Sequence, residues 1–272
     1  MKHYGLIGRP LGHSWSQAYF REKFSKEGIT DADYTPFEAP ANVQDADSLR
    51  RWLKGTSGEG GLVRAHHLLG FNVTLPFKQT LMPLLDEVEE AAQRIGAVNT
   101  VCVYWQDEVH FTLRGFNTDA PAFADTLRPR LQPWHTEALV LGTGGAARAV
   151  AYALAELGIR PTFVSRTPSR PQPWPTVDYS KAVELARSVF LLVNATPVGT
   201  HPDEASTPWP DVHTLSPRHL CYDVVYNPEE TRFLLQAELC GADTLGGRAM
   251  LHRQAELSWQ WWRSVDLAGE GR

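Results

Sequence analysis

The chain has 272 residues, 43% of them hydrophobic and 21% charged, and a formal net charge of −5. This length accommodates one large domain or two medium ones, each with its own core. The acidic balance argues against a nucleic-acid partner and against a basic membrane-binding surface. No apolar run approaches the length that is needed to span a membrane. Cys102, Cys221 and Cys240 fit no disulfide framework and no metal-ligand spacing, which is typical of a reducing cytoplasm.

The first third of the chain predicts alternating strands and helices. We expect strands at 4–7 and 34–37, and helices at 17–27, 46–54 and 62–69. Ser14 and Ser16 stand just before the first helix. Two hydroxyls and the N–H groups of a helix start suit an anion, and simple N-capping is the alternative.

The stretch from Gly70 to Lys78 predicts a strand that ends in polar groups. Apolar residues at 71, 73 and 75 alternate with Asn72 and Thr74, Pro76 ends the strand, and Lys78 begins an expected helix that ends near position 90. An amide, a hydroxyl and an ammonium would thus meet at the carboxyl end of a strand, where open α/β sheets bind ligands. The alternative is an edge strand with one solvated face and a surface lysine.

Two further strands, at 97–101 and 109–113, complete a pattern consistent with a mostly parallel sheet. The first of them again contains an asparagine, Asn99. Thr118 or Asp119 then begins a helix that runs to about 127, and either residue could be only its N-cap. The proline-rich turn 128–134 marks the passage into a second domain.

The second domain begins with a glycine-rich turn between a strand at 138–141 and a helix at 147–157. Gly142, Gly144 and Ala147 occupy the positions of the dinucleotide-binding fingerprint. The next strand, 162–165, is followed by Arg166, where an acidic residue would bind a ribose 2′-hydroxyl. An arginine suits a 2′-phosphate, so the sequence predicts NADP rather than NAD.

Four prolines between 168 and 175 exclude a regular helix from the segment after this strand. Arg170, in the same segment, either helps to hold the phosphate or is a solvated loop charge. Strands are expected at 189–193 and 220–225, helices at 180–187, 233–241 and 250–262, and a hinge at Gly246-Gly247. The last helix contains three tryptophans that we interpret as packing residues: Trp259, Trp261 and Trp262.

Taken together, these segments resemble the shikimate dehydrogenase family, in the family's order and over nearly the whole chain. The segments that carry the resemblance are Gly12-His13-Ser14-Trp15-Ser16, Gly70–Lys78, Gly96-Ala97-Val98-Asn99-Thr100, Asn117-Thr118-Asp119, Gly142-Thr143-Gly144-Gly145-Ala146, Asn194-Ala195-Thr196-Pro197, Tyr226-Asn227-Pro228 and Met250–Ala255.

The resemblance implies reversible, NADP-dependent reduction of 3-dehydroshikimate to shikimate in the chorismate and aromatic amino-acid pathway. It implies a cytoplasmic α/β protein, monomer or homodimer, with a mostly parallel substrate domain, a Rossmann-like NADP-binding domain and an active site between them. The shikimate-binding domain would comprise residues 1–114 and 246–272. The NADP-binding domain would comprise residues 115–245, with a linker helix at about 117–127.

The resemblance also implies roles for individual residues. The catalytic pair would be Lys78 and Asp119, and the substrate would be bound by Ser14, Ser16, Asn72, Thr74, Asn99, Tyr226 and Gln254. The candidate cofactor-binding residues are Gly142, Gly144, Gly145, Ala146, Ser165, Arg166, Thr167, Arg170, Asn194, Thr196, Val224 and Gly247. Hydride transfer to a carbonyl needs a proton donor beside the developing alkoxide, so Lys78 is either that donor or an electrostatic anchor.

Two positions depart from the family's pattern: Ser165 stands where asparagine is common, and Thr200 where methionine is common. Both positions lie on the cofactor side.

Two other functions stay open: a quinate/shikimate dehydrogenase, and a non-catalytic ligand sensor that uses the same cleft. The sensor predicts the loss of Lys78 or Asp119, and both residues are present.

Overall fold

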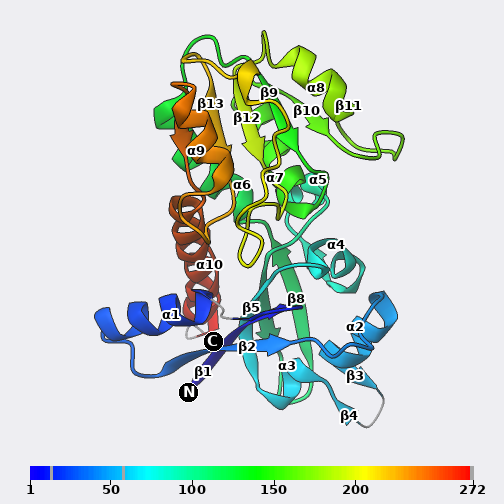
Figure 1. Cartoon of the computed structure of the whole chain (residues 1–272). Coiled ribbons are helices and arrows are strands. Elements are labelled where there is room, and N and C mark those ends of the chain that lie inside the picture. Colours follow the sequence, from blue (N-terminus) through cyan, green and yellow to red (C-terminus); the bar gives the residue numbers. More distant parts are fainter. Residues whose placement is uncertain (13–14, 57–58, 270–272) are drawn as a thin grey trace. The chain divides into compact units, whose positions relative to one another are not determined.

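The computed structural model describes residues 1–12, 15–56 and 59–269 (Figure 1). The chain divides into two compact units. Unit 1 comprises Met1–Thr118 and Ala255–Arg272, and unit 2 comprises Asp119–Gln254. None of the helices in the described part of the chain combines the length and the apolar character that crossing a membrane requires.

Unit 1 contains a six-stranded mixed sheet among its described residues, in the order β2-β1-β5-β7-β8-β6. Strand β7 runs antiparallel to β5 and β8, and the other neighbouring pairs are parallel. The strands are β1 (Lys2–Gly8), β2 (Ala32–Glu38), β5 (Leu68–Val73), β6 (Glu87–Val88), β7 (Thr100–Trp105) and β8 (Phe111–Phe116). A short hairpin, β3 (Gly55–Thr56) and β4 (Glu59–Gly60), lies apart from this sheet.

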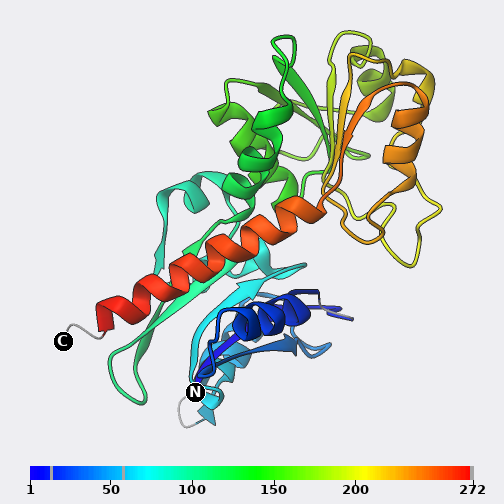
Figure 2. The ribbon, with the colours of Figure 1, turned by 90° about the vertical axis from the view of Figure 1, so that its left-hand side faces the viewer.

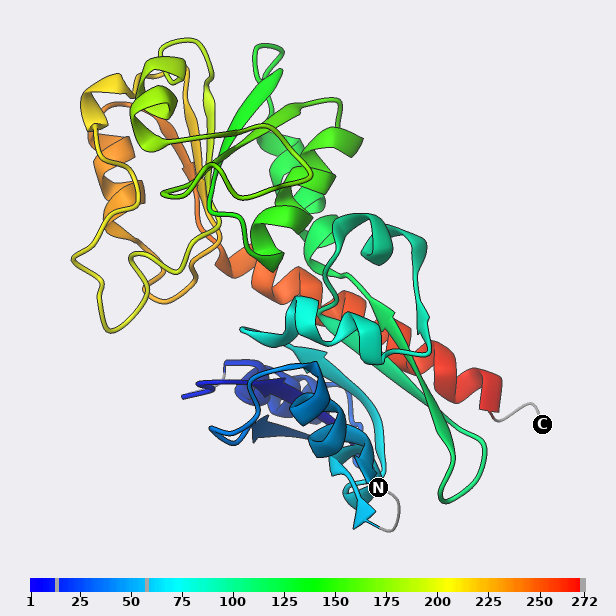
Figure 3. The same cartoon turned by 90° about the vertical axis from the view of Figure 1, so that its right-hand side faces the viewer.

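Helices cover both faces of this sheet. Helices α1 (Trp15–Lys26) and α10 (Arg248–Gly269) bury an aromatic core on one face, which includes Tyr4, Phe20 and Trp262. Helices α2 (Ala46–Lys54) and α3 (Leu62–Ala65) pack on the other face over Phe71 and Val73. Figure 2 shows the blue α1 and the red α10 in front of the strands, and Figure 3 shows α2 in front of them.

The local sequence explains where α2 begins and ends. The Asp45 carboxylate accepts from the Ser48 N–H, and the Ser48 hydroxyl accepts from the Asp45 N–H, which is a reciprocal capping box. Gly55 follows the helix with a φ of 82°, a conformation that favours glycine. The predicted helix 46–54 is therefore confirmed at both ends.

Three sequence predictions in unit 1 are wrong. The helix expected at 62–69 ends at Ala65, because Leu68 already pairs with β1. The helix expected from Lys78 to about 90 is three short pieces, α4 (Phe77–Thr80), a 3₁₀ turn (Met82–Leu84) and β6, followed by α5 (Glu90–Ile95). The alternative of an edge strand also fails, because β5 lies between β1 and β7.

Unit 2 contains a six-stranded, fully parallel sheet in the order β11-β10-β9-β12-β13-β14 within the described residues. Numbered along this unit, the order is 3-2-1-4-5-6, which is that of a doubly wound nucleotide-binding sheet. The strands are β9 (Glu137–Leu141), β10 (Arg160–Val164), β11 (Thr176–Val177), β12 (Leu191–Asn194), β13 (Leu220–Asp223) and β14 (Asp243–Leu245).

Two layers of helices cover this sheet, as Figure 2 shows with the green helices on one side and the orange α9 on the other. Tyr222 of β13 packs against Phe123 of α6 on one face, and Phe233 of α9 joins Leu139 and Leu192 on the other. The helices are α6 (Asp119–Leu127), α7 (Gly145–Glu156), α8 (Tyr179–Leu185) and α9 (Arg232–Leu239), with 3₁₀ turns at Arg128–Arg130 and Val212–Thr214. Residues 165–175, all described, form turns and bends, which confirms the prediction from the four prolines.

Candidate functional site

The glycine turn of unit 2 lies at the switch point of its sheet, between β9 and β12. Gly142 has a φ of 101°, and a Cβ there would lie 3.0 Å from Thr196 Cγ2 and 3.3 Å from the Ala195 carbonyl oxygen. The Ala195 N–H donates to the Leu141 carbonyl across 3.0 Å. The turns after the two strands are therefore in contact, as ligand binding at a switch point requires.

Space for an anion lies over the start of α7. Gly144 is the N-cap of this helix and is exposed, and no described atom lies within 4 Å of the position that a Cβ would take. Its carbonyl accepts from the Arg148 N–H, whereas the N–H groups of the first turn have no such partner by helix geometry. A phosphate group fits this site, because the N–H groups and the helix dipole both favour negative charge.

The loop after β10 carries the predicted residues for the 2′-phosphate. Ser165 accepts from the Thr167 N–H across 3.1 Å, and the Arg170 N–H donates to the Thr167 carbonyl across 3.3 Å. Arg166, Thr167 and Arg170 are all exposed. The loop therefore presents two guanidinium groups at the same sheet edge as the glycine turn.

A buried carboxylate holds the turns after β12 and β13. Asp223 accepts from Asn194 Nδ2 and from the Val225 N–H, each across 2.9 Å, and from the Thr231 hydroxyl across 2.7 Å. Burial raises the pKa of Asp223 to about 6, and the three hydrogen bonds oppose that shift. Asn194 is buried in these contacts, so its predicted role at the cofactor stays a prediction.

Two other predicted cofactor residues lie beside this network. The Val224 N–H donates to the Asn194 carbonyl across 2.9 Å, and a Cβ on Gly247 would lie 2.3 Å from the Val224 carbonyl oxygen. Thr200, where methionine is common in the family, donates to the Asn227 carbonyl across 3.1 Å. This contact joins the turn after β12 to the Tyr226-Asn227-Pro228 segment.

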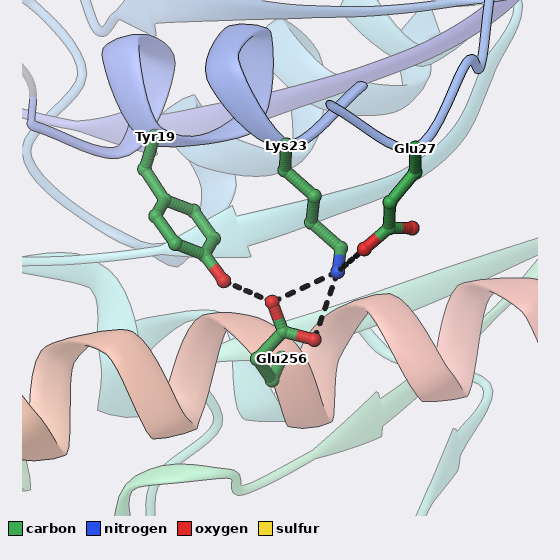
Figure 4. Close-up of polar contacts among 4 residues, drawn as sticks. All are labelled: Tyr19, Lys23, Glu27 and Glu256. Carbon is green, nitrogen blue, oxygen red and sulfur yellow. Dashed lines mark hydrogen bonds and ion pairs between the residues drawn. The ribbon is translucent and has the colours of Figure 1, made fainter. Parts of the chain in front are cut away.

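In unit 1, a charged cluster fixes α1 against α10 (Figure 4). Lys23 Nζ lies 2.8 and 2.9 Å from the two oxygens of Glu256 and 2.5 Å from Glu27, and the Tyr19 hydroxyl also donates to Glu256. Burial of Lys23 disfavours its charge, but these hydrogen bonds outweigh that effect and raise its pKa. Ser16, in the first turn of α1, is thereby placed relative to α10, whereas Ser14 lies outside the described residues.

Asn72 and Asn99 meet in a buried polar network. Asn72 Nδ2 lies 3.2 Å from the Asn99 carbonyl oxygen, 3.2 Å from Thr100 Oγ1 and 2.9 Å from Ser258 Oγ. The side-chain oxygen of Asn99 accepts from the Thr118 N–H across 2.7 Å. Both asparagines are nearly inaccessible, at 6% and 2% exposed, so the expectation of a solvated face at Asn72 is wrong.

The turn after β5 places the next two candidates. The Thr74 N–H donates to the Ile7 carbonyl across 2.9 Å, and the Val98 N–H donates to the Lys78 carbonyl across 2.8 Å. The backbone of Lys78 is therefore held against Val98, the residue before Asn99. The structure brings Asn72, Asn99 and Lys78 into one region of unit 1.

The remaining candidates belong to unit 2. Asp119 is the first residue of α6 and is 5% exposed, and Tyr226 follows β13 and is 43% exposed. Gln254 Nε2 donates to the Leu251 carbonyl within α10 across 3.0 Å. Arg253 and Asp125 pair across 2.7 Å and so connect the start of α10 to α6.

Sequence reasoning missed the residues that connect these side chains: Tyr34, Thr100, Thr118, Ser258, Asp223 and Thr231. Ser258 carried a usable signal, because it lies four residues after Gln254 and so shares a face of the helix with it. Thr100 and Thr118 lie inside motifs already noted, but Thr100 was given no side-chain role and Thr118 was interpreted only as a helix start or N-cap.

Unit 2 has a doubly wound parallel sheet with a glycine turn at its switch point, and unit 1 is a second α/β unit that contains a buried polar network. Together they define the class of two-domain nucleotide-dependent α/β proteins. Comparisons with known proteins go further. The family model for the shikimate dehydrogenase substrate binding domain matches residues 6–101. The shikimate dehydrogenase (NADP(+)) of Symbiobacterium thermophilum is 36% identical, over 95% of this chain and 87% of that protein.

Two comparisons with proteins of Thermus thermophilus agree. A shikimate dehydrogenase (NADP(+)) of this species is 38% identical, over 97% of this chain and 94% of that protein. The crystal structure of a shikimate 5-dehydrogenase from the same species, in complex with NADP(H) and shikimate, superposes with a TM-score of 0.80 at 36% identity, over 96% of this chain and 93% of that one. The chain belongs to the shikimate dehydrogenase family.

Proposed function

We propose that this protein is an NADP-dependent shikimate dehydrogenase that reduces 3-dehydroshikimate reversibly to shikimate. The observation that carries the proposal is the 36% identity, over almost the whole chain, to an enzyme crystallised with NADP(H) and shikimate. The glycine turn and the arginine after β10 support NADP as the cofactor. Membership of the family supports a role in the shikimate pathway, and we propose that the reaction takes place in the cytoplasm, since all three cysteines are free thiols.

We assign most of the substrate-binding residues to unit 1, with Tyr226 and Gln254 from unit 2, and the cofactor to unit 2. The open space at Gly144 and the helix start behind it would hold the pyrophosphate, and Arg166 would bind the 2′-phosphate with help from Arg170. Bound NADPH supplies the hydride. Ser14 and Ser16 would bind the carboxylate, assisted by Tyr226, and Asn72, Thr74, Asn99 and Gln254 would bind ring hydroxyls.

The proton is the part of the chemistry that this chain supplies. As the carbonyl carbon receives the hydride, its oxygen gains negative charge, and the Lys78 ammonium either donates a proton to it or stabilises the charge. Asp119 would be the second member of the catalytic pair, with a carboxylate that accepts from a hydroxyl of the substrate. Side chains that hydrogen-bond several hydroxyls discriminate strongly against analogues that lack one.

An assay with the purified protein tests the proposal directly. We expect NADPH absorbance to fall when 3-dehydroshikimate is added, and NADP⁺ to be reduced when shikimate is added. Faster turnover of quinate than of shikimate would instead support a quinate/shikimate dehydrogenase. Binding of shikimate and NADPH with no turnover would support a ligand sensor. Size-exclusion chromatography distinguishes a monomer from a homodimer.

A further inference from the structure

One carboxylate of α10 holds two side chains of α1 (Figure 4). The Lys23 ammonium lies 2.8 and 2.9 Å from the two oxygens of Glu256, and the Tyr19 hydroxyl donates to the same group. The Lys23 side chain is only 8% exposed. Hydrogen bonds that involve a charged partner are shorter and stronger than neutral ones, and they depend on direction. Glu256 therefore holds α1 at two points that lie one helical turn apart.

The aromatic core between the same two helices is less specific about their arrangement. The ring centroid of Phe20 lies 5.5 Å from that of Trp262, and the centroid of Phe24 lies 5.1 Å from that of Trp259. Both pairs of rings are tilted rather than stacked. Burial of apolar surface stabilises the packed helices, but it depends on area and not on direction. The core thus supplies stability, whereas the bonds to the carboxylate select how α1 is rotated and shifted along α10.

Tyr19 carries this constraint to the start of α1. Its ring stacks on that of Trp15, with the centroids 4.6 Å apart and an angle of 19° between the planes. Trp15 is the first residue of the helix, and Ser16 follows it. Residues four apart lie on the same face of a helix, so the stacked pair forms one continuous stripe. The Glu256 carboxylate holds the hydroxyl of Tyr19, while the ring of Tyr19 supports the turn that contains Ser16.

The same part of α10 also holds another residue assigned to the substrate in unit 1. Ser258 is fully buried, and its Oγ lies 2.9 Å from Asn72 Nδ2. Ser16 is assigned to the substrate carboxylate and Asn72 to a ring hydroxyl. Glu256 and Ser258 stand two residues apart on one helix. The separation of the two binding groups therefore depends on how α1 and β5 are each held by α10.

We propose that Glu256 and Tyr19 are positioning residues for the substrate carboxylate, which hold the start of α1 so that Ser16 keeps a fixed place relative to Asn72. The proposal rests on the proposed function, which supplies the roles of Ser16 and Asn72. Glu256 and Tyr19 act through Ser16 and not by touching the ligand. Loss of their bond should weaken recognition of the carboxylate and leave the aromatic core closed.

The shikimate kinetics of Glu256→Ala test this role. The KM and the Kd for shikimate should rise about threefold to tenfold, which corresponds to the loss of one hydrogen bond. The kcat should stay within about twofold of the wild type, because a misplaced carboxylate contact weakens the bound substrate and the transition state alike. Glu256→Gln keeps an acceptor oxygen for Tyr19 and Lys23 and should recover most of the affinity. The Kd for NADPH, which we assign to unit 2, should not change.

Glu27→Ala is the matched control. Glu27 also bonds to the Lys23 ammonium, at 2.5 Å, but that bond joins residues four apart in the sequence and not two helices. The KM for shikimate should therefore stay at the wild-type value in Glu27→Ala. In Glu256→Ala, the same bond leaves the largely buried Lys23 with a charged partner, so this variant avoids an unpaired buried charge.

A double-mutant cycle separates positioning from a general loss of stability. Ser16→Ala removes the carboxylate contact, so Glu256→Ala should add less than about twofold to the Kd for shikimate in that background. Additive effects, an unchanged KM in Glu256→Ala or an equal rise in Glu27→Ala would each overturn the proposal. Should Glu256→Ala fail to fold, Tyr19→Phe replaces it in the cycle, because it retains the ring against Trp15 and loses only the hydroxyl. We expect Tyr19→Phe to raise the KM about twofold to fivefold, and an unchanged KM would overturn the proposal.

Hydrogen exchange without any ligand distinguishes a failure of this proposal from a failure of the proposed function. Peptides from residues 15–26 should exchange faster in Glu256→Ala than in the wild type or in Glu27→Ala. Equal exchange in Glu256→Ala and the wild type would overturn the positioning of α1. Wild-type protein that neither binds nor converts shikimate would refute the proposed function, and with it the role of Ser16, whatever the exchange rates.

Discussion

The side-chain amide of Asn194 donates to the carboxylate of Asp223 across 2.9 Å, and both residues are fully buried. Asn194 Oδ1 in turn accepts from the Thr196 N–H at 3.0 Å and from its hydroxyl at 2.6 Å. Through Thr231, the same carboxylate reaches the N-cap of α9. One charged group therefore sets the conformation of two turns at the sheet edge assigned to the cofactor.

Asp223→Asn should change how stability depends on pH. The pKa of Asp223 is about 6 in the folded protein and 3.8 when solvated. Between these two pH values the carboxyl group is therefore protonated in the folded state and ionised in the unfolded state. Its contribution to stability is fully present below pH 3.8 and is lost as the pH rises through 6. Relative to Asp223→Asn, the wild type should lose up to about 3 kcal/mol of unfolding free energy between about pH 4 and pH 8. Urea unfolding across this range measures the difference.

Asp178→Asn provides a control of opposite sign. Asp178 is the exposed N-cap of α8, and hydrogen bonds from the Ser180 hydroxyl and the Lys181 N–H lower its pKa. The contribution of Asp178 to the free energy of unfolding is present above the pKa that it has in the unfolded state. This contribution is lost as the pH falls through the lower pKa that it has in the folded state. If both variants responded to pH in the same direction, burial would not be the cause of the behaviour of Asp223.

Gly144→Ala should separate cofactor binding from folding. The φ of −76° suits alanine and no described atom obstructs the Cβ, so stability should change little. A phosphate that approaches the backbone would meet the new methyl group, and we expect the KM for NADPH to rise at least tenfold, roughly the effect of losing one charge-assisted hydrogen bond. Steady-state kinetics and thermal melting measure the two effects.

Gly158→Ala is the matched substitution at the other end of α7. Gly158 has a φ of 77°, so alanine there should cost about 1 kcal/mol of stability. Its KM for NADPH should match the wild type. A Gly144→Ala enzyme with normal KM for NADPH would exclude a close approach of the cofactor to this turn.

Lys78→Ala should abolish turnover while leaving most of the substrate binding. Loss of a positioned proton donor typically lowers kcat by about 10²- to 10⁴-fold. Lys54→Ala serves as the control in the same unit, because Lys54 pairs with Asp86 at 3.2 Å and has no assigned role in the chemistry. Near-normal kcat in Lys78→Ala would remove this lysine from the mechanism.

Arg166→Ala should weaken NADP far more than NAD. Loss of a charge-assisted bond to the 2′-phosphate predicts roughly a tenfold to hundredfold rise in the KM for NADPH, with little change for NADH. Arg160 lies at the opposite end of the same strand and pairs with Glu137 at 2.8 Å, so Arg160→Ala should leave both constants unchanged. Equal effects of Arg166→Ala on the two cofactors would argue against a phosphate contact.

The fold of unit 2 was largely predictable because its parallel strands are continuous apolar runs separated by glycine and proline turns. In unit 1 the helix expected from Lys78 onward failed where Asp86 accepts from the Leu113 N–H at 2.7 Å and Glu87 pairs with β8. The apolar spacing fitted a helix, but strand pairing with residues about 27 positions away decided the outcome. Local sequence contains no trace of such a contact.

In the candidate site, too, residues marked by local sequence were predicted and residues that depend on long-range contacts were missed. Motifs identified all four candidates: Asn72 and Asn99 lie within predicted strands, and Lys78 and Asp119 lie at the start of predicted helices. Tyr34 and Ser258 were missed because their roles depend on three elements, β2, β5 and α10, that meet only in the folded unit. Tyr34 belongs to no periodic pattern that marks it, and the helical spacing of Ser258 from Gln254 is the one local signal that was available.

Helix α10 begins in unit 2, and from Ala255 onward its residues belong to unit 1, where Trp259 and Trp262 complete the aromatic core that Tyr4 and Phe20 start. During translation, residues 1–118 therefore cannot complete this aromatic core until α10 has left the ribosome, whereas the core on the other face of the sheet contains no residue of α10. The continuous segment Asp119–Gln254 faces no such delay. We therefore expect unit 1, although most of its residues are synthesised first, to complete its folding after unit 2.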